Sequence, residues 1–490
     1  MTSYISSSHL PIAARFKGRL GLVAFLVLVA GAGALVGWNP QVALLLLGAE
    51  IALCYIVLCY ARPFVAFAIL VFVALTVWLS SITILLGLTA MVGLGLIFTG
   101  VWAMRLAMRQ VRFVMVKEYR WLGALTVIIF LSLLFNLNGP AGIEPMATYI
   151  ELILFVVLTV NFVTTVAELK TLSYVVVASS VLLALPVILN QYGWLPEGLQ
   201  LQVVNAYLNP TDPIAREAGL WGDPNFTAVQ LIVGLPFILV LWSHARRLTV
   251  RLFLGLILAS ILWAFTLTFS ITGLVGIVIV LLFSGQLYRR RRFIASAAIT
   301  IVTVVVVLGL ASALLPNNFV ERIAENVDIV SEYISTPRST ILLQVGTHRG
   351  DTWQAGLRSI ANAPVLGHGP GNGEYTNAKY ALILQKDKLA AHNVFLDIGS
   401  DIGLVGLTAF AGLLLAGVLA VSPLSSRAES LPIEGRALGK ALFVALVAMS
   451  VQGMGLDIQI MKILWLLIGM TLVFKRLALE TGSSPYNFES

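Results

Sequence analysis

Hydrophobic runs of about 20 residues, separated by short polar or basic segments, follow one another along almost the whole chain. One such run is long enough to cross a bilayer as a single α-helix. The pattern predicts about fourteen transmembrane helices. We place them at 19–37, 41–60, 63–80, 82–104, 121–137, 147–165, 171–189, 226–243, 250–268, 272–287, 294–315, 396–420, 437–454 and 458–474. The expected fold is therefore an all-α polytopic membrane protein, with residues 1–490 in a single integral membrane domain.

The composition agrees with this prediction and excludes a soluble fold. The chain is 59% hydrophobic and 11% charged, with a mean hydropathy of +0.95, whereas soluble domains carry about 25% charged residues. The net charge of +8 does not indicate nucleic acid as a partner, because the basic residues form short clusters between apolar runs. Such clusters are typical of topology signals.

The lysines and arginines orient the spans. With the N-terminus in the cytoplasm, 22 of the 31 lie on cytoplasmic segments, as the positive-inside rule requires. An even number of spans then places both termini in the cytoplasm. The nine on the outer side are Arg216, Arg322, Arg338, Arg349, Arg358, Lys379, Lys386, Lys388 and Lys462. These exceptions mark the best candidates for a site.

Two outer segments are much longer than the others. The first is 190–225, and the second is a large outer loop, 316–395, between spans eleven and twelve. Long segments of this kind are usually functional or disordered. Apolar residues recur at helical spacing from Phe319 to Ile334, which predicts an amphipathic helix on the membrane surface. Seven basic and seven acidic residues balance in the large loop, so it does not resemble a polyanion-binding arm.

Arg216 and Arg349 are candidates for binding a lipid phosphate or diphosphate. The guanidinium is always charged, and its planar fork suits phosphate oxygens. The alternative for each is a surface ion pair, because Glu217 follows Arg216 and Asp351 follows Arg349 by two residues. Both interpretations stay open on sequence alone.

His392 stands where the large loop becomes the twelfth span. An imidazole at the membrane surface, with a pKa near 6.5, can act as a general base at neutral pH. The alternative is a capping or packing histidine. Asn393, Asp397 and Asp401 follow at i, i+4 and i+8 on one helical face, and such a polar stripe inside a bilayer is usually functional. We expect it to orient His392 or to bind a sugar hydroxyl.

A metal site is only weakly indicated. His392, Asp397 and Asp401 carry possible ligands, but no histidine pair has i, i+4 spacing. We therefore predict no metal and no cofactor. The glycine-rich run that contains Gly367 and Gly369 superficially resembles a nucleotide-binding loop, but no strand–helix unit in a cytoplasmic domain precedes it. Its glycines permit tight turns and could bring backbone N–H groups close to a glycan or phosphate.

Taken together, these motifs resemble those of the O-antigen ligase and Wzy-type O-antigen polymerase superfamily. The resemblance covers roughly 200–410. Its parts are Arg349 with Trp353, Pro-x-x-Gly-x-Gly at 364–369, His-Asn-x-x-Leu at 392–396, Gly-Leu-x-Gly at 403–406, and an earlier segment with Arg216, Pro224 and Asn225.

The resemblance implies a GT-C-type, metal-independent, inverting glycosyltransferase of the bacterial inner membrane whose active site faces the periplasm. Its donor would be a glycan on undecaprenyl diphosphate. A ligase would use lipid A-core as acceptor; a polymerase would use another lipid-linked repeat, with a chain-length regulator as a further partner. His392 would be the catalytic base, and Arg216 and Arg349 would bind the diphosphate. The supporting residues would be Asn393, Asp397, Asp401, Trp353, Gly367, Gly369 and Asn225.

The chain also departs from the family pattern. Ser270–Gly273 stands where the family often has Ser-Arg-Gly, and Asp401 stands where glutamate is common. Fourteen spans exceed the twelve expected of a ligase, which favours a polymerase, whereas the His-Asn signature is typical of ligases. The choice between ligase and polymerase therefore stays open. Two rivals are a transporter or flippase of lipid-linked oligosaccharides, which predicts related halves and a midplane cavity, and a shape-and-division-type peptidoglycan polymerase.

Overall fold

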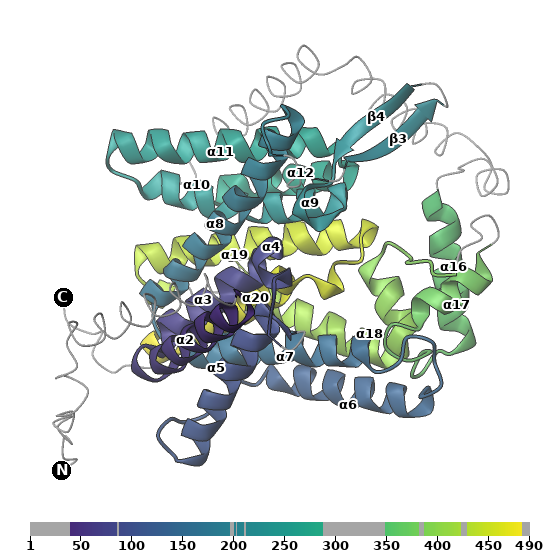
Figure 1. Cartoon of the computed structure of the whole chain (residues 1–490), viewed down its shortest axis with the longest axis horizontal. Helices are drawn as coiled ribbons and strands as arrows, with labels where there is room; N and C mark the ends of the chain where they lie inside the picture. Colours follow the sequence, from purple (N-terminus) through teal and green to yellow (C-terminus); the bar gives the residue numbers. More distant parts are fainter. Residues whose placement is uncertain are drawn as a thin grey trace. The chain divides into compact units, whose positions relative to one another are not determined.

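The structure of the chain is a computed structural model (Figure 1). It describes residues 40–85, 88–196, 200–201, 203–209, 212–287, 348–381, 387–422 and 429–482. The chain divides into two compact units, Met1–Phe113 and Val114–Ser490. The spans expected at 19–37 and 294–315, and the amphipathic segment from Phe319 to Ile334, lie outside the described residues.

The first unit combines helices with one β-hairpin. Its elements are α2 (Pro40–Ala61), α3 (Pro63–Leu75), α4 (Val77–Ser81), β1 (Thr83–Leu85), β2 (Leu88–Thr89) and α5 (Ala90–Ala107). The spans predicted at 41–60 and 63–80 are helical, the first as α2 and the second as α3 followed by α4. The helix expected at 82–104 begins only at Ala90, because the residues before it pair as the antiparallel strands β1 and β2. Thr89 caps α5 by accepting a hydrogen bond from a backbone N–H of the first turn.

Aromatic residues hold the helices of this unit together. The rings of Phe67 and Phe98 pack with centroids 5.7 Å apart, within the usual range for aromatic pairs. The Arg105 guanidinium lies 5.1 Å from the centre of the Tyr60 ring, near the end of α2. Arg62 follows that helix directly, so the two arginines share one end of the unit. The topology predicted from sequence places both on the cytoplasmic side.

The second unit is larger and almost entirely helical. Its helices are α6 (Tyr119–Phe135), α7 (Glu144–Phe162), α8 (Val166–Gln191), α9 (Pro224–Val233), α10 (Leu235–His244), α11 (Leu248–Thr268), α12 (Ile271–Leu287), α16 (His348–Asn362), α17 (Gly373–Tyr380), α18 (Val394–Ala420), α19 (Ile433–Gln452) and α20 (Lys462–Gly482). Its described residues also include the short 3-10 turns η1 (Gly219–Trp221), η4 (Gly453–Gly455) and η5 (Ile458–Ile460), and the strands β3 (Val203–Asn209) and β4 (Asp212–Glu217).

The length and composition of the described helices fit a multi-pass membrane protein. Seven helical segments are long and apolar enough to cross a membrane, and four shorter apolar helices accompany them. Described helices of the second unit overlap the predicted spans, with α9 and α10 together covering 226–243, whereas α16 and α17 lie in the large outer loop. The total of about fourteen spans stays a prediction, because two of them fall outside the described residues.

Helix α20 forms the core of the second unit. All residues from Ile463 to Phe474 are buried, as expected for a helix that is hydrophobic all round. Helices α7, α18 and α19 pack against it. At Gly469 an added Cβ would lie 2.7 Å from the Thr159 Cβ of α7, so only glycine permits this approach. The core helix therefore gives a fixed base to the η4–η5 segment that precedes it.

Charged residues at one end of this unit are paired with one another or with backbone carbonyls. Lys475 of α20 contacts Glu118, and the Lys170 ammonium lies 2.9 Å from the Glu434 carboxylate. Arg476 donates to two carbonyl oxygens at the C-terminus of α7, at 2.7 and 2.5 Å. A cation at that position also complements the helix dipole. These basic residues, assigned to the cytoplasmic side by the sequence, have ordinary structural roles.

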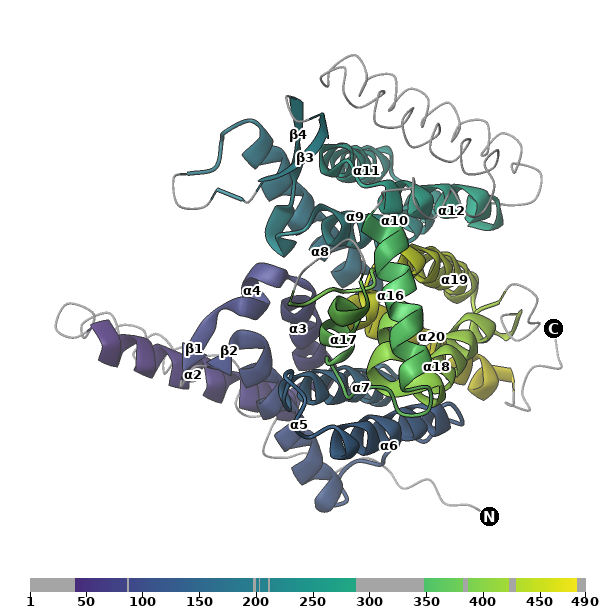
Figure 2. The same ribbon diagram turned by 90° about the vertical axis from the view of Figure 1, so that its right-hand side faces the viewer.

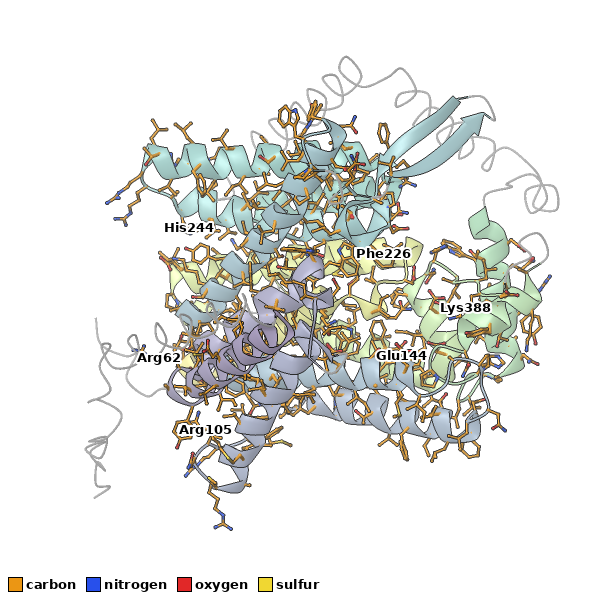
Figure 3. The ribbon with its side chains drawn as sticks, in the orientation of Figure 1. Arg62, Arg105, Glu144, Phe226, His244 and Lys388 are labelled. Atoms are coloured by element: carbon orange, nitrogen blue, oxygen red, sulfur yellow. The ribbon has the colours of Figure 1, made fainter. Side chains whose placement is uncertain are left out.

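The motif-bearing elements gather at the opposite end. Figure 3 shows His244 of α10 at one end of the second unit and Lys388 toward the other. Helices α16 and α17 lie across that second end, near the start of α18 (Figures 1 and 2). Strands β3 and β4, which run antiparallel from the Val203–Glu217 pair to the Asn209–Asp212 pair, also extend there (Figure 1). The segment 190–225, expected as a loop, thus holds a β-hairpin and η1.

Candidate active site

The start of α18 is built by polar side chains. Asn393 is the N-cap residue, and its Oδ1 accepts from Phe395 N at 3.0 Å and Leu396 N at 3.4 Å. Asp397 Oδ1 accepts from Ala391 N at 2.8 Å, which folds the preceding segment back onto the helix. Two members of the predicted polar stripe therefore fix the local backbone, as N-terminal caps commonly do.

His392, between these two anchors, has a φ of 51°. Positive φ is unfavourable for a residue with a Cβ, and such strain clusters at functional sites. Its Nδ1 lies 3.2 Å from Asp457 Oδ1, and 46% of the histidine side chain is exposed, against 15% for the aspartate. A partly buried carboxylate thus holds a solvent-accessible imidazole in one orientation.

A carboxylate outside the predicted polar stripe contacts the imidazole. It is that of Asp457, whereas Asp397 Oδ1 accepts from Ala391 N. The prediction that the acidic stripe orients His392 or binds a sugar hydroxyl stays a prediction. Asp457 lies between η4 and η5, in the short link between two spans. In the sequence, Asp457 appears only as an acidic residue in a short outer link between two predicted spans. That position does not identify His392, 65 residues away, as its partner.

Helix α18 is broken in the middle. Ile402 has φ −126° and ψ 18°, and Gly403 has φ 71° and ψ −178°. The carbonyl oxygens freed before the break accept hydrogen bonds from the glycine-rich loop, at 3.0 Å from His368 N to Ser400 O and at 2.9 Å from Gly369 N to Asp401 O. The loop therefore satisfies the backbone groups that the break exposes.

Glycine is required where this loop meets α18. Gly367 has φ 64°, and an added Cβ would lie 2.5 Å from the Asp401 backbone; at Gly403 it would lie 2.2 Å from Val365 O. The expectation that this loop offers N–H groups to a glycan or phosphate is therefore wrong at Gly369, whose N–H bonds to α18. Its glycines permit backbone-to-backbone packing instead.

Asp401 joins three elements from inside the protein. Its Oδ1 accepts from Gly373 N at 2.9 Å, at the start of α17. Its Oδ2 accepts from the Tyr149 hydroxyl of α7 at 3.4 Å. Ser132 of α6 donates to the Asp401 carbonyl oxygen at 3.1 Å. The buried carboxylate thus anchors α17, and this role differs from the predicted binding of a sugar hydroxyl.

Helix α16 lies against the His392 segment. Thr352 Oγ1 donates to Ala391 O at 3.2 Å, and the His368 Nε2 lies 3.0 Å from Ser359 O. Trp353, which follows Thr352 in the helix, is 39% exposed. Arg349 lies in the first turn of α16, but its side chain is outside the described part of the structure. Its predicted role stays a prediction.

Arg216 is held by neutral oxygens from two other segments. Its Nε donates to Thr268 O at 3.0 Å, and its NH2 group donates to Asn225 Oδ1 at 3.1 Å. Ser270 Oγ donates to the same Asn225 oxygen at 2.8 Å. Between them, Phe269 has a φ of 49°. The end of α11 therefore contacts Arg216 directly through Thr268 O, and Ser270 shares the Asn225 oxygen with it.

The alternative interpretation of Arg216 as the partner of Glu217 does not match the geometry of β4. Successive side chains of a strand point to opposite faces, and Glu217 Oε2 accepts from Asn190 Nδ2 at 2.8 Å. Burial raises the pKa of Glu217, and the Asn190 hydrogen bond acts against that shift. The structure thus brings the predicted residues Arg216 and Asn225 together and turns Glu217 elsewhere.

Among the residues that the structure describes, no group of three or more His, Cys, Asp or Glu side chains could hold a metal ion. The fold and the site define a multi-pass helical membrane protein with a histidine–aspartate pair and an oriented arginine at one end of its larger unit. Residues 256–411 match the family model described as O-antigen ligase. This match confirms the resemblance to the O-antigen ligase and Wzy-type superfamily. A search of curated proteins found no match for the chain.

The matched segment runs from α11 into α18. It therefore contains Arg349, the glycine-rich loop and His392, whereas Arg216 and Asp457 lie outside it. At the level of the family, the match supports glycan transfer of the O-antigen ligase kind. The structure adds the contact between Asp457, which lies outside the matched segment, and His392, which lies inside it.

Proposed function

We propose that this protein transfers an oligosaccharide from undecaprenyl diphosphate to an acceptor sugar hydroxyl at the periplasmic face of the bacterial inner membrane. The reaction is metal-independent and inverts the anomeric configuration. The observation that carries this proposal is the contact between His392 Nδ1 and Asp457 Oδ1, 3.2 Å apart, in a chain whose central segment matches the O-antigen ligase family.

The contact favours His392 as a general base. When Nδ1–H donates to Asp457, the neutral ring keeps Nε2 as its acceptor, in the arrangement that aspartate–histidine pairs use in hydrolases. The exposed fraction of the side chain leaves Nε2 accessible to an acceptor hydroxyl. Asp457 also stabilises the imidazolium that forms when the proton is taken up. General-base catalysis of this kind contributes about 10²–10⁴-fold to the rate.

Arg216 fits the role of a diphosphate-binding residue. Its Nε and NH2 groups are oriented by the Thr268 carbonyl and the Asn225 amide. These two contacts orient the guanidinium, and its permanent positive charge and planar fork suit a diphosphate. Arg349, in the matched segment, is proposed as the second cation. Together they would stabilise the negative charge that develops on the departing diphosphate.

The step balances as one displacement. The acceptor oxygen forms a bond to the anomeric carbon while the bond from that carbon to the phosphate oxygen breaks. The bonding electrons leave with undecaprenyl diphosphate, and the hydroxyl proton passes to His392 Nε2. Because the diphosphate is already a good leaving group, positioning and charge stabilisation carry most of the catalysis.

A transfer assay with purified protein identifies the acceptor. Purified protein in liposomes receives a defined undecaprenyl-diphosphate oligosaccharide and EDTA, with lipid A-core in one set and without it in the other. Glycan on lipid A-core, read by gel shift and mass spectrometry, identifies a ligase. Growth of the lipid-linked glycan by whole repeats without lipid A-core identifies a polymerase. The absence of any covalent product, with the lipid crossing the vesicle membrane, overturns the proposal in favour of a flippase.

A further inference from the structure

A second acidic residue, Glu374, interacts electrostatically with both members of the histidine–aspartate pair and has no role in the motifs discussed above. Glu374 is in the first turn of α17 and its side chain is half-buried. Its backbone carbonyl accepts from Leu389 N at 3.0 Å. Leu389 is three residues before His392, so this bond fixes the strand-like segment that leads into the histidine.

The neighbouring residue fixes α17 from the other side. Gly373 N donates to Asp401 Oδ1 of α18 at 2.9 Å, and an added Cβ at Gly373 would lie 2.7 Å from the same oxygen. The start of α17 is thus held between α18 and the segment before His392. The half-buried Glu374 side chain therefore leaves from a backbone turn that is fixed relative to the segment leading to His392.

The charges around Glu374 connect it to the catalytic pair. Burial raises the pKa of the Glu374 carboxyl, and Asp457 raises it further, while Lys388 and His392 act in the opposite direction. Asp401 and Tyr149, on the α18 and α7 sides, also interact electrostatically with Glu374. Lys388 lies over the Tyr375 ring, 4.7 Å from its centre. The carboxyl therefore shares one electrostatic environment with His392 and Asp457.

We infer that Glu374 is a further positioning residue for His392: its carboxylate stabilises the imidazolium that forms when the acceptor hydroxyl is deprotonated. This inference rests on the proposed function. Asp457 fixes the orientation of the ring through Nδ1, whereas Glu374 acts through its charge at longer range. Keeping a half-buried carboxylate ionised costs free energy. Stabilisation of the imidazolium in the transition state would explain why the protein keeps an ionised carboxylate there.

The test compares pH–rate profiles of transfer for the full-length protein in liposomes, with Glu374→Gln, Glu374→Asp and Glu144→Gln. In Glu374→Gln the imidazole loses a nearby negative charge and is protonated less readily. The acidic limb of the profile should therefore move to lower pH by about 0.5 unit, with a fall of about twofold in the plateau rate. Donor KM should stay unchanged. Glu374→Asp keeps the negative charge, so the acidic limb of its pH–rate profile should stay at the wild-type pH.

Glu144→Gln is the matched control. Glu144 is exposed in the first turn of α7, and Figure 3 shows it at the same end of the unit as Lys388. Its loss should leave the profile unchanged. A Glu374→Gln profile that superimposes on the wild type, while His392→Ala is inactive, overturns this inference and leaves the proposed function intact. Full activity of His392→Ala, or no transfer by the wild type, overturns the proposed function and the inference with it.

Discussion

The basic residues at the two ends of the larger unit are held in different ways. At the end assigned to the cytoplasm, Lys475 and Lys170 face carboxylates, and Arg476 closes the C-terminus of a helix. At the other end, Arg216 receives its orientation from a carbonyl and an amide oxygen. The two lysines therefore sit in ion pairs, whereas the two contacts that orient Arg216 come from neutral oxygens beside the predicted site. The lysines fit topology signals, and Arg216 stays the candidate binding residue.

The largest expected effect comes from the imidazole itself. His392→Ala removes the base, and we expect the transfer rate to fall by about 10²–10⁴-fold. The protein should keep its elution volume and thermal stability, because the exposed side chain contributes little packing. Radiolabelled or mass-resolved product formation measures the rate. Transfer at the wild-type rate would eliminate His392 as the base.

A smaller effect is expected when the carboxylate partner is neutralised. Asp457→Asn keeps the shape of the side chain but removes the charge that holds the Nδ1 proton and stabilises the imidazolium, so we expect a loss of about 10²-fold. Donor KM should change little. Asp457→Asn with normal kcat would show that the 3.2 Å contact is structural.

Arg216 and Lys170 give the direct comparison of the two ends. Arg216→Gln should lower kcat/KM for the donor by about 10²-fold, since it removes one cation from the site of developing charge. Lys170→Gln breaks an exposed pair and should leave transfer unchanged, with a stability change of about 0.5 kcal/mol or less. If Arg216→Gln and Lys170→Gln lowered kcat/KM for the donor equally, Arg216 would no longer be distinguished from a structural cation.

The smallest effect on catalysis is expected at the break in α18. Gly403→Ala places a Cβ 2.2 Å from Val365 O at a φ of 71°, so we expect it to destabilise the protein by about 1–3 kcal/mol. The melting temperature in detergent or lipid measures this loss. Below the melting temperature, the surviving protein should retain most of its activity. Gly406→Ala, where an added Cβ meets only the side chain of Ile402, is the comparison within the same helix.

Much of the fold was predictable because each apolar run carries its own signal. Length and hydrophobicity decide whether a segment forms a helix in a membrane protein, and helices form at the expected places in the described ranges. The β-hairpins at 83–89 and 203–217 were missed. Strand pairing depends on contacts between segments, and these short polar or mixed stretches carry no strong periodicity.

The site was predictable to the extent that its residues stand next to one another in sequence. The His392–Asn393 segment and Arg216 with Asn225 stood out by motif and by their exception to the charge rule. Asp457 did not, since its role arises from a tertiary contact across 65 residues, and the contact of Ser270 with Asn225 spans 45 residues. The carboxylates of Asp397 and Asp401 were recognised as unusual, but no sequence pattern identifies their partners, which are backbone N–H groups and the Tyr149 hydroxyl.

The break at Ile402 and Gly403 divides α18 into a protein-enclosed half and a lipid-facing half. Residues 397–403 are all buried, whereas Leu404, Val405, Leu415 and Leu419 are exposed. The part after the break is roughly 17 residues long, or ~25 Å at 1.5 Å per residue, close to the ~30 Å hydrocarbon thickness. Irregular backbone at membrane depth is tolerated only inside protein. Under the proposed function, the buried first half would hold His392 beyond the lipid-exposed part of the helix, on the side from which the acceptor hydroxyl approaches.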